Sequence, residues 1–315
     1  MAYFDSVAKS TKDFFKRSFS KDSTVEFSAK ADNGVKVTLD GGVKTKVKVD
    51  KATKAESVSK TGSTSIKLEY KKTPVSLDKL EVASAGTVKA DISVPDLVPN
   101  TKITFKVEDG HAAGANTSGK FGVETVQDFG VSAGVKAELD AVQGDGSFSL
   151  LLKKSGVLVG ASTAFTTPLA PVAAPAEGEK AKAASFALTD YDAVLGYTTG
   201  AATFAVQSEK KFSAATGYVH AEVTPQVKVA GKATVSLAGK AKGPGSPIKG
   251  AIGGSYVVDK DVTLYGAVSD AAVLQGAAVL QVAPKATLTV YGEIDALNVE
   301  QDGKHFFGTK LALRA

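Results

Sequence analysis

Positively charged residues recur at every second position along several segments of the chain. The run from Val43 to Val49 reads VKTKVKV, so its lysines share one side of an extended strand. Lysines that line one wall lower the barrier to anions passing along it, within a screening length of about 8 Å at physiological salt. The alternation places the following residues on that face: Lys36, Lys44, Lys46, Lys48, Lys67, Lys89, Lys102, Lys106, Lys228 and Lys232.

A second basic group lies near the N-terminus. The apolar residues between Tyr3 and Phe15 have helical spacing, and charged residues fill the other side. This pattern predicts one amphipathic helix within residues 1–20. We expect it to be retained rather than cleaved as a mitochondrial transit peptide, because such peptides avoid acidic residues and are rich in arginine. Its basic residues would join the lysines of that strand face: Lys9, Lys12, Lys16 and Arg17.

Other kinds of chemistry have little support. The chain has no cysteine, which excludes disulfides and thiolate metal sites, and its three histidines lie far apart in sequence. The segment Gly114 to Lys120 fits GxxxxGK, but Phe121 occupies the Ser/Thr position that would bind magnesium, and a strand-like segment follows. We therefore expect no catalytic residue, metal site or cofactor. The net charge of +5 and pI near 9.0 favour an anionic partner.

Period-2 alternation in segments of about ten residues dominates the rest of the chain. Turn pairs such as Asn33-Gly34 and Asp145-Gly146 separate these segments, which is typical of sequential antiparallel hairpins. The segments predict roughly nineteen to twenty-one strands in one array over residues 21–315. A longer turn is expected near Asp50 to Thr61, and the Pro/Ala-rich stretch 166–182 is expected to be a loop inserted in the same array.

So many short strands require a large sandwich, a propeller or a barrel. The apolar face is mostly Val, Ala and Gly, and aromatic residues make up only 7%, which is too little bulk for a large soluble core. A closed barrel with lipid outside and water inside needs no such core. No apolar stretch approaches the roughly 18 to 20 residues of a membrane-spanning helix. The N-terminus shows no apolar signal-peptide region, which argues against a secreted bacterial barrel.

The two ends of the chain resemble a known family, the mitochondrial porins or voltage-dependent anion channels. The ending Gly303 to Ala315 reads GKHFFGTKLALRA and is similar to the terminal strand of that family, and the order of turns from Ser255 onward is also similar. At the other end, Tyr3, Asp5, Lys9, Ser10 and Asp13 to Phe15 resemble its N-terminal helix. One departure is that residues 17–20 read RSFS where the family has a glycine-rich hinge.

The resemblance implies an all-β fold, a 19-stranded transmembrane β-barrel with the N-terminal amphipathic α-helix inside the pore and parallel pairing of the first and last strands. It further implies a voltage-gated, weakly anion-selective channel of the mitochondrial outer membrane that passes nucleotides and phosphate. The expected partners are membrane lipid and anionic metabolites. Association into a homo-oligomer or a mitochondrial membrane complex stays open. The lipid-facing acidic residue of some family members is not transferred to Glu81, because alternation is irregular there.

Three alternatives compete with this interpretation. The related barrel of the mitochondrial protein-import translocase would share the fold, but an acidic lumen would suit its cationic presequences better. A soluble structural β-protein would dissolve without detergent. Nucleic-acid binding would explain the positive charge, but aromatic residues are not interleaved with the lysines as a stacking platform requires.

Overall fold

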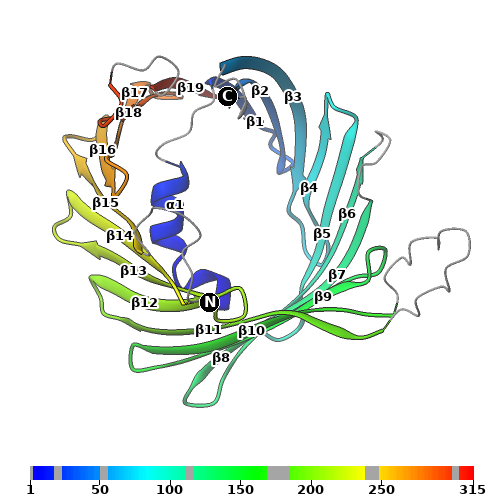
Figure 1. Ribbon diagram of the computed structural model, residues 1–315. Helices are drawn as coiled ribbons and strands as arrows, with labels where there is room; N and C mark the ends of the chain where they lie inside the picture. Colours follow the sequence, from blue (N-terminus) through cyan, green and yellow to red (C-terminus); the bar gives the residue numbers. More distant parts are fainter. Residues whose placement is uncertain are drawn as a thin grey trace, which may run out of the picture.

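The computed structural model describes residues 3–17, 23–49, 56–110, 117–168, 185–237, 248–299 and 305–315. Its strands form one closed 19-stranded barrel around a short N-terminal helical segment (Figure 1). The first ten strands are β1 (Ser23–Lys30), β2 (Val35–Val49), β3 (Glu56–Tyr70), β4 (Ser76–Ala83), β5 (Thr87–Val98), β6 (Thr101–Gly110), β7 (Ser118–Asp128), β8 (Ser132–Asp140), β9 (Asp145–Lys154) and β10 (Val157–Thr166). The others are β11 (Ala187–Thr198), β12 (Ala202–Glu209), β13 (Ala214–Glu222), β14 (Val227–Ser236), β15 (Ile248–Val257), β16 (Val262–Ser269), β17 (Val273–Ala283), β18 (Ala286–Asp295) and β19 (Phe306–Arg314).

Each strand pairs antiparallel with the next one along the chain, and the barrel closes between its two ends. β1 and β19 pair in parallel, from Thr24 opposite Lys310 to Ser28 opposite Arg314. Parallel closure is a necessary result of an odd number of sequential antiparallel strands, because the first and last then run in the same direction. The fold class predicted from the sequence is therefore confirmed, including the strand number and the helix inside the barrel (Figure 1).

The sequence pattern predicts one continuous N-terminal helix, but the structure has two helical pieces. It consists of a 3-10 turn, η1 (Phe4–Ser6), followed by the α-helix α1 (Lys9–Arg17). The hydroxyl Oγ of Ser6 accepts a hydrogen bond from Tyr3 N at 2.9 Å and donates one to Tyr3 O at 2.6 Å. A serine side chain that bonds the nearby backbone in this way competes with the helical pattern, so the first turn winds more tightly.

One turn prediction is wrong and another is wrong in part. Of the turn expected near Asp50 to Thr61, residues 56–61 belong to β3, which pairs with β2 as far as Val49, and residues 50–55 lie outside the described residues. Asp145-Gly146 was expected to be a turn, but Asp145 begins β9. The chain reverses earlier, where Asp140 Oδ1 accepts hydrogen bonds from Val142 N at 3.0 Å and Gln143 N at 2.9 Å. Of the predicted loop 166–182, Thr166 ends β10 and residues 169–182 lie outside the described residues.

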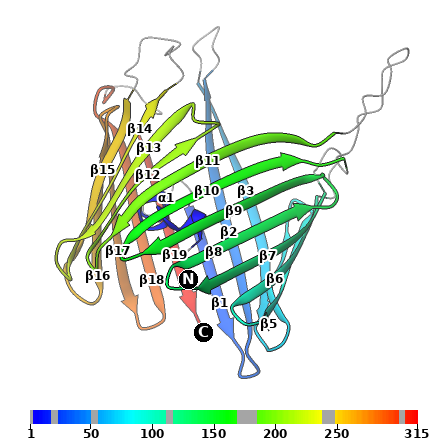
Figure 2. The ribbon, with the colours of Figure 1, turned by 90° about the horizontal axis from the view of Figure 1, so that it is seen from below.

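Side chains alternate between the lumen and the outer surface along most strands. On β18, for example, Val290 is 40% exposed on the outside, whereas its neighbour Tyr291 is 6% exposed on the inside. The outer positions carry exposed Val, Leu, Ile and Phe on nearly every strand. None of the described helices is long or apolar enough to cross a membrane. Figure 2 shows the strands tilted around the barrel wall, with α1 enclosed behind them.

Candidate ion-selective pore lining

The N-terminal segment is held in the lumen by an apolar patch on four neighbouring strands. Phe4 of η1 and Val7, which follows it, are buried and form one cluster with side chains of β9 to β12. We call the strand residues of this cluster the docking patch: Leu151, Leu158, Val194 and Ala205. Removing a Phe and a Val side chain from water contributes about 1.5–3 kcal/mol each, so the contact is strong enough to hold a short segment in place.

The docking patch was not identified from the sequence, although a signal for it is present. Alternation is interrupted by apolar triplets at Leu150 to Leu152, Val157 to Val159 and Ala193 to Leu195. A strand with consecutive apolar residues is typical of a strand covered on both faces. Here lipid covers one face and the N-terminal segment covers the other. These triplets therefore mark where the segment lies against the wall.

Polar and aromatic contacts continue this attachment along α1. Thr11 is 2% exposed, and its Oγ1 donates a hydrogen bond to Val219 O at 3.0 Å. The ring of Phe14 lies 6.0 Å from the ring of Tyr265, centroid to centroid. A Cβ at Gly253 would meet Phe14 Cε1 at 2.8 Å, so only glycine leaves room for this ring. The helix thus lies along the inner wall from β9 to β16 (Figure 1).

Most of the lumen lysines on the opposite side form ion pairs with carboxylates one or two strands away. We call this region, from β19 through β1 to β8, the paired wall. Lys67 pairs with Asp40. The other nitrogen-to-oxygen distances are 2.6 Å for Lys310–Glu26, 3.2 Å for Lys36–Glu69, 2.6 Å for Lys89–Glu108, 2.8 Å for Lys102–Asp78 and 2.7 Å for Lys106–Glu138.

The pairs cancel much of the positive charge that the sequence predicts for this wall. Glu138 also accepts Lys120 at 3.5 Å, and Lys136 lies 3.5 Å from Glu124 and 3.3 Å from Asp5 of the N-terminal segment. Partly exposed pairs of this kind contribute about 0.2–1 kcal/mol each to stability. The pairs contribute little to stability, but they strongly reduce the net charge of the wall. A lysine and a carboxylate at the same depth have no net charge for a passing ion.

Three predicted lysines have no described carboxylate within ion-pair distance: Lys12 and Lys16 lie four residues apart on α1, and Lys232 lies on β14 against Phe15 of the same helix. We call Lys12, Lys16 and Lys232 the basic strip. Lys12 Nζ donates to Gln207 Oε1 at 3.1 Å and lies 5.1 Å from the centre of the Tyr218 ring. Lys232 Nζ, on β14, lies 4.9 Å from the centre of the Phe15 ring. Such contacts hold an ammonium group without cancelling its charge.

The other predicted pore-lining residues are placed differently. Lys9 Nζ pairs with Asp13 on the same helix at 2.9 Å, and Lys228 lies 3.5 Å from Glu222. Lys44, Lys46 and Lys48 belong to β2, and Arg17 ends α1, but their side chains lie outside the described residues. Glu81 pairs with Lys79 and lines a cavity on the lumen side together with Lys67 and Lys310. Within the described ranges, no cluster of three or more His, Asp and Glu side chains could hold a metal ion.

Neutralising carboxylates of the paired wall should expose its hidden charge. Replacing Glu69 and Glu108 together with glutamine leaves Lys36 and Lys89 without their ion-pair partners, so we expect the anion-to-cation permeability ratio to rise. The measurement is the reversal potential across a planar bilayer under a fixed salt gradient. A ratio that stayed constant or fell would contradict the pairing described above.

Comparison with known proteins agrees with this architecture. The eukaryotic porin family model matches residues 181–308. No curated protein matches the sequence. Among solved structures, a mutant porin of Rhodopseudomonas blastica is 12% identical, with a TM-score of 0.44, covering 86% of this chain and 96% of that one. OmpT, an outer membrane protein of Vibrio cholerae, is 11% identical with a TM-score of 0.36, covering 84% and 87%. Likenesses at this level of identity and TM-score assign no role to this chain.

The family match covers the second half of the barrel, from the segment before β11 to β19. The closed barrel and its apolar outer face support a transmembrane pore-forming channel rather than an enzyme. By this match, residues 181–308 are similar to the eukaryotic porin family, and the whole chain has the closed-barrel fold of a pore.

Proposed function

We propose that the chain forms a voltage-gated, weakly anion-selective channel of the mitochondrial outer membrane, through which anionic metabolites such as nucleotides and phosphate diffuse. The observation that supports this best is the basic strip. Its three ammonium groups have no described carboxylate partner, whereas the lysines of the paired wall have one. A net positive charge along one side of a wide aqueous pore lowers the barrier to anions and raises it for cations.

The selectivity is expected to be weak for two reasons. Ions in a lumen of this width keep most of their hydration, and charges separated by more than about 8 Å are screened at physiological salt. Carboxylates also lie on the strands beside the basic strip. Asp190, Asp192 and Glu209, on β11 and β12, offset part of its charge. Nucleotides and phosphate are favoured over cations of similar size, but cations also pass.

Voltage would act on the charges that have no partner at the same depth. The work of moving one charge is about 2.3 kcal/mol for each 100 mV of potential that it crosses. An ion pair that moves as a unit carries no net charge across the field. The proposal therefore assigns the voltage response to α1, which bears Lys12 and Lys16 and is held by side-chain contacts rather than by strand pairing.

The test is a planar-bilayer measurement of the purified protein under a salt gradient. We expect a reversal potential that indicates a weak preference for anions, and lower conductance at high voltage of either sign. Cation-preferring channels blocked by a presequence peptide would instead indicate the protein-import barrel. Correctly folded protein that forms no channels, or that is soluble without detergent, would refute a pore function.

A further inference from the structure

The seam between β1 and β19 differs from every turn-connected strand pair of this barrel. β1 begins at Ser23, opposite Val43 of β2, although β2 continues to Val49. Beyond Val43, β3 is the only strand described beside β2. β1 and β19 share five register pairs, as few as β3 with β4 and β11 with β12, and all five are parallel. Parallel pairs are slightly less stable per residue than antiparallel ones. The seam is therefore one of the shortest joints among the described strands and the parallel one.

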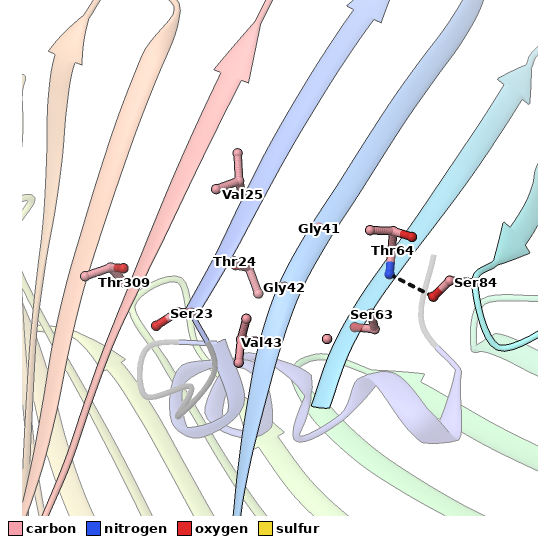
Figure 3. Close-up of a pocket in the computed structure, with 11 residues that line it drawn as sticks. Ser23, Thr24, Val25, Gly41, Gly42, Val43, Ser63, Thr64, Ser84 and Thr309 are labelled. Carbon is pink, nitrogen blue, oxygen red and sulfur yellow. Dashed lines mark hydrogen bonds between the residues drawn. The ribbon is translucent and has the colours of Figure 1, made fainter. Parts of the chain in front are cut away.

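The wall is also thin beside the seam, on β1 to β3. A cavity of about 550 Å³ opens on its outer side, where Val25 and Val43 lie at the surface, and Figure 3 shows its lining. A second cavity, of about 420 Å³, lies on the lumen side and is lined by Glu26, Lys67 and Lys310 among others. Both cavities share the same lining residues on the strands between them: Thr24, Gly41, Gly42, Ser63 and Thr64. Little more than backbone separates lumen from lipid there.

Among the described residues, one ion pair crosses the seam. Lys310 Nζ of β19 lies 2.6 Å from Glu26 Oε2 of β1, and the neighbouring pair of Lys67 with Asp40 extends the network to β2 and β3. On the outer side, Ser23 and Thr309 are small and polar (Figure 3), and the apolar Val25 is the register partner of Leu311. The charged attraction across the joint therefore lies on the lumen side, whereas the outer side offers only apolar contacts for which lipid competes.

Separation of the seam releases more chain entropy than separation of any hairpin. Two strands joined by a short turn stay close after their hydrogen bonds break, so little freedom is gained. β1 and β19 have no such tether, because Glu26 and Lys310 are 284 residues apart in the sequence. We propose that Glu26 and Lys310 form a clasp that holds this seam closed, and that the barrel wall opens first at the seam when the clasp is broken.

The test is amide hydrogen exchange of the full chain in lipid vesicles, with Glu26→Gln and Lys310→Gln as single variants. Each should speed exchange about two- to fivefold in β1 and β19, while β9 and β10 keep the wild-type rate. The double variant should show no further increase, and the exchanged pair Glu26→Lys with Lys310→Glu should return the rates toward wild type. The matched control, Lys102→Gln with Asp78→Asn, removes a similar pair away from the seam and should leave seam exchange unchanged.

A disulfide across the seam gives a second readout, because the chain has no other cysteine. Val25 and Leu311 are register partners, and adjacent paired residues lie within the range that a disulfide spans. Val25→Cys with Leu311→Cys in the Glu26→Gln background should restore slow exchange when oxidised and lose it when reduced. Unchanged seam exchange in both single variants, equal acceleration in all strands, or fast exchange with the disulfide formed would each overturn the proposal. None of these measurements depends on ion selectivity.

Discussion

Replacing Lys12, Lys16 and Lys232 together with glutamine lowers the anion-to-cation permeability ratio by about five- to tenfold. A single charge about 8 Å from an ion in water contributes about 0.2 kcal/mol after screening at physiological salt, so three contribute about 0.6 kcal/mol. Removing them raises the barrier for an anion by this amount and lowers it for a cation. The measurement is the reversal potential in a planar bilayer under a salt gradient.

The control for this prediction neutralises a pair rather than three separate lysines. Lys89→Gln with Glu108→Gln removes one positive and one negative charge, whose groups lie 2.6 Å apart, so the permeability ratio should stay at the wild-type value. Lys89→Gln alone would not be a suitable control, because it leaves Glu108 with an uncompensated charge. If the pair variant shifted the ratio as much as the triple variant, the basic strip would not be the source of selectivity.

Replacing Leu151 with alanine releases the N-terminal segment from the wall. Leu151 is 1% exposed and belongs to the cluster that holds Phe4 and Val7. Loss of a fully buried leucine side chain costs about 2–5 kcal/mol, which is comparable to the whole apolar contribution of the contact. We expect a spin label on Ser10→Cys, the only cysteine in such a variant, to become markedly more mobile. The open-channel conductance should rise at the same time, because the segment no longer narrows the lumen.

The neighbouring residue supplies the control. Leu152 is 39% exposed on the outer face, so Leu152→Ala removes the same atoms from the same strand without touching the docking patch. Its spin-label mobility and conductance should match those of the labelled wild type. Equal label mobility in the Leu151→Ala and Leu152→Ala variants would show that the docking patch does not hold the segment.

The fold was largely predictable because the alternation of apolar and polar residues indicates which face of each strand contacts lipid and which contacts water. The alternation of apolar and polar residues predicts the strands, and the odd number of strands predicts the parallel seam. The helical spacing of residues 3–15 predicts the N-terminal segment. The errors come from local hydrogen bonds. Asp140 turns the chain before the Asp145-Gly146 pair is reached, and Ser6 tightens the first turn of the helix. Side-chain-to-backbone bonds of this kind outweigh the turn propensity of a dipeptide.

The sequence predicted which residue types line the pore, but it did not predict which of their charges are paired. The alternation along each strand places Lys89 and Lys102 in the lumen. Whether each lysine lies near a carboxylate depends on strand register, and a shift of one residue would change its partner. The pairing of Lys102 with Asp78 even joins β6 to β4 across the intervening β5. Lys12 and Lys232 lack a carboxylate partner because of where α1 docks. The position of α1 follows in turn from the apolar triplets of β9 to β11.

Closure between the first and last strands also determines the order in which the barrel can be completed. The parallel joint connects the first strand to the last, so no partial chain can form it, whereas each hairpin can form from adjacent residues. Contacts between such distant residues form slowly, because a very long loop must close. Until that step, β1 and β19 each expose an edge able to pair with another chain. Folding of this protein therefore requires that both edges be shielded until the last strand is in place.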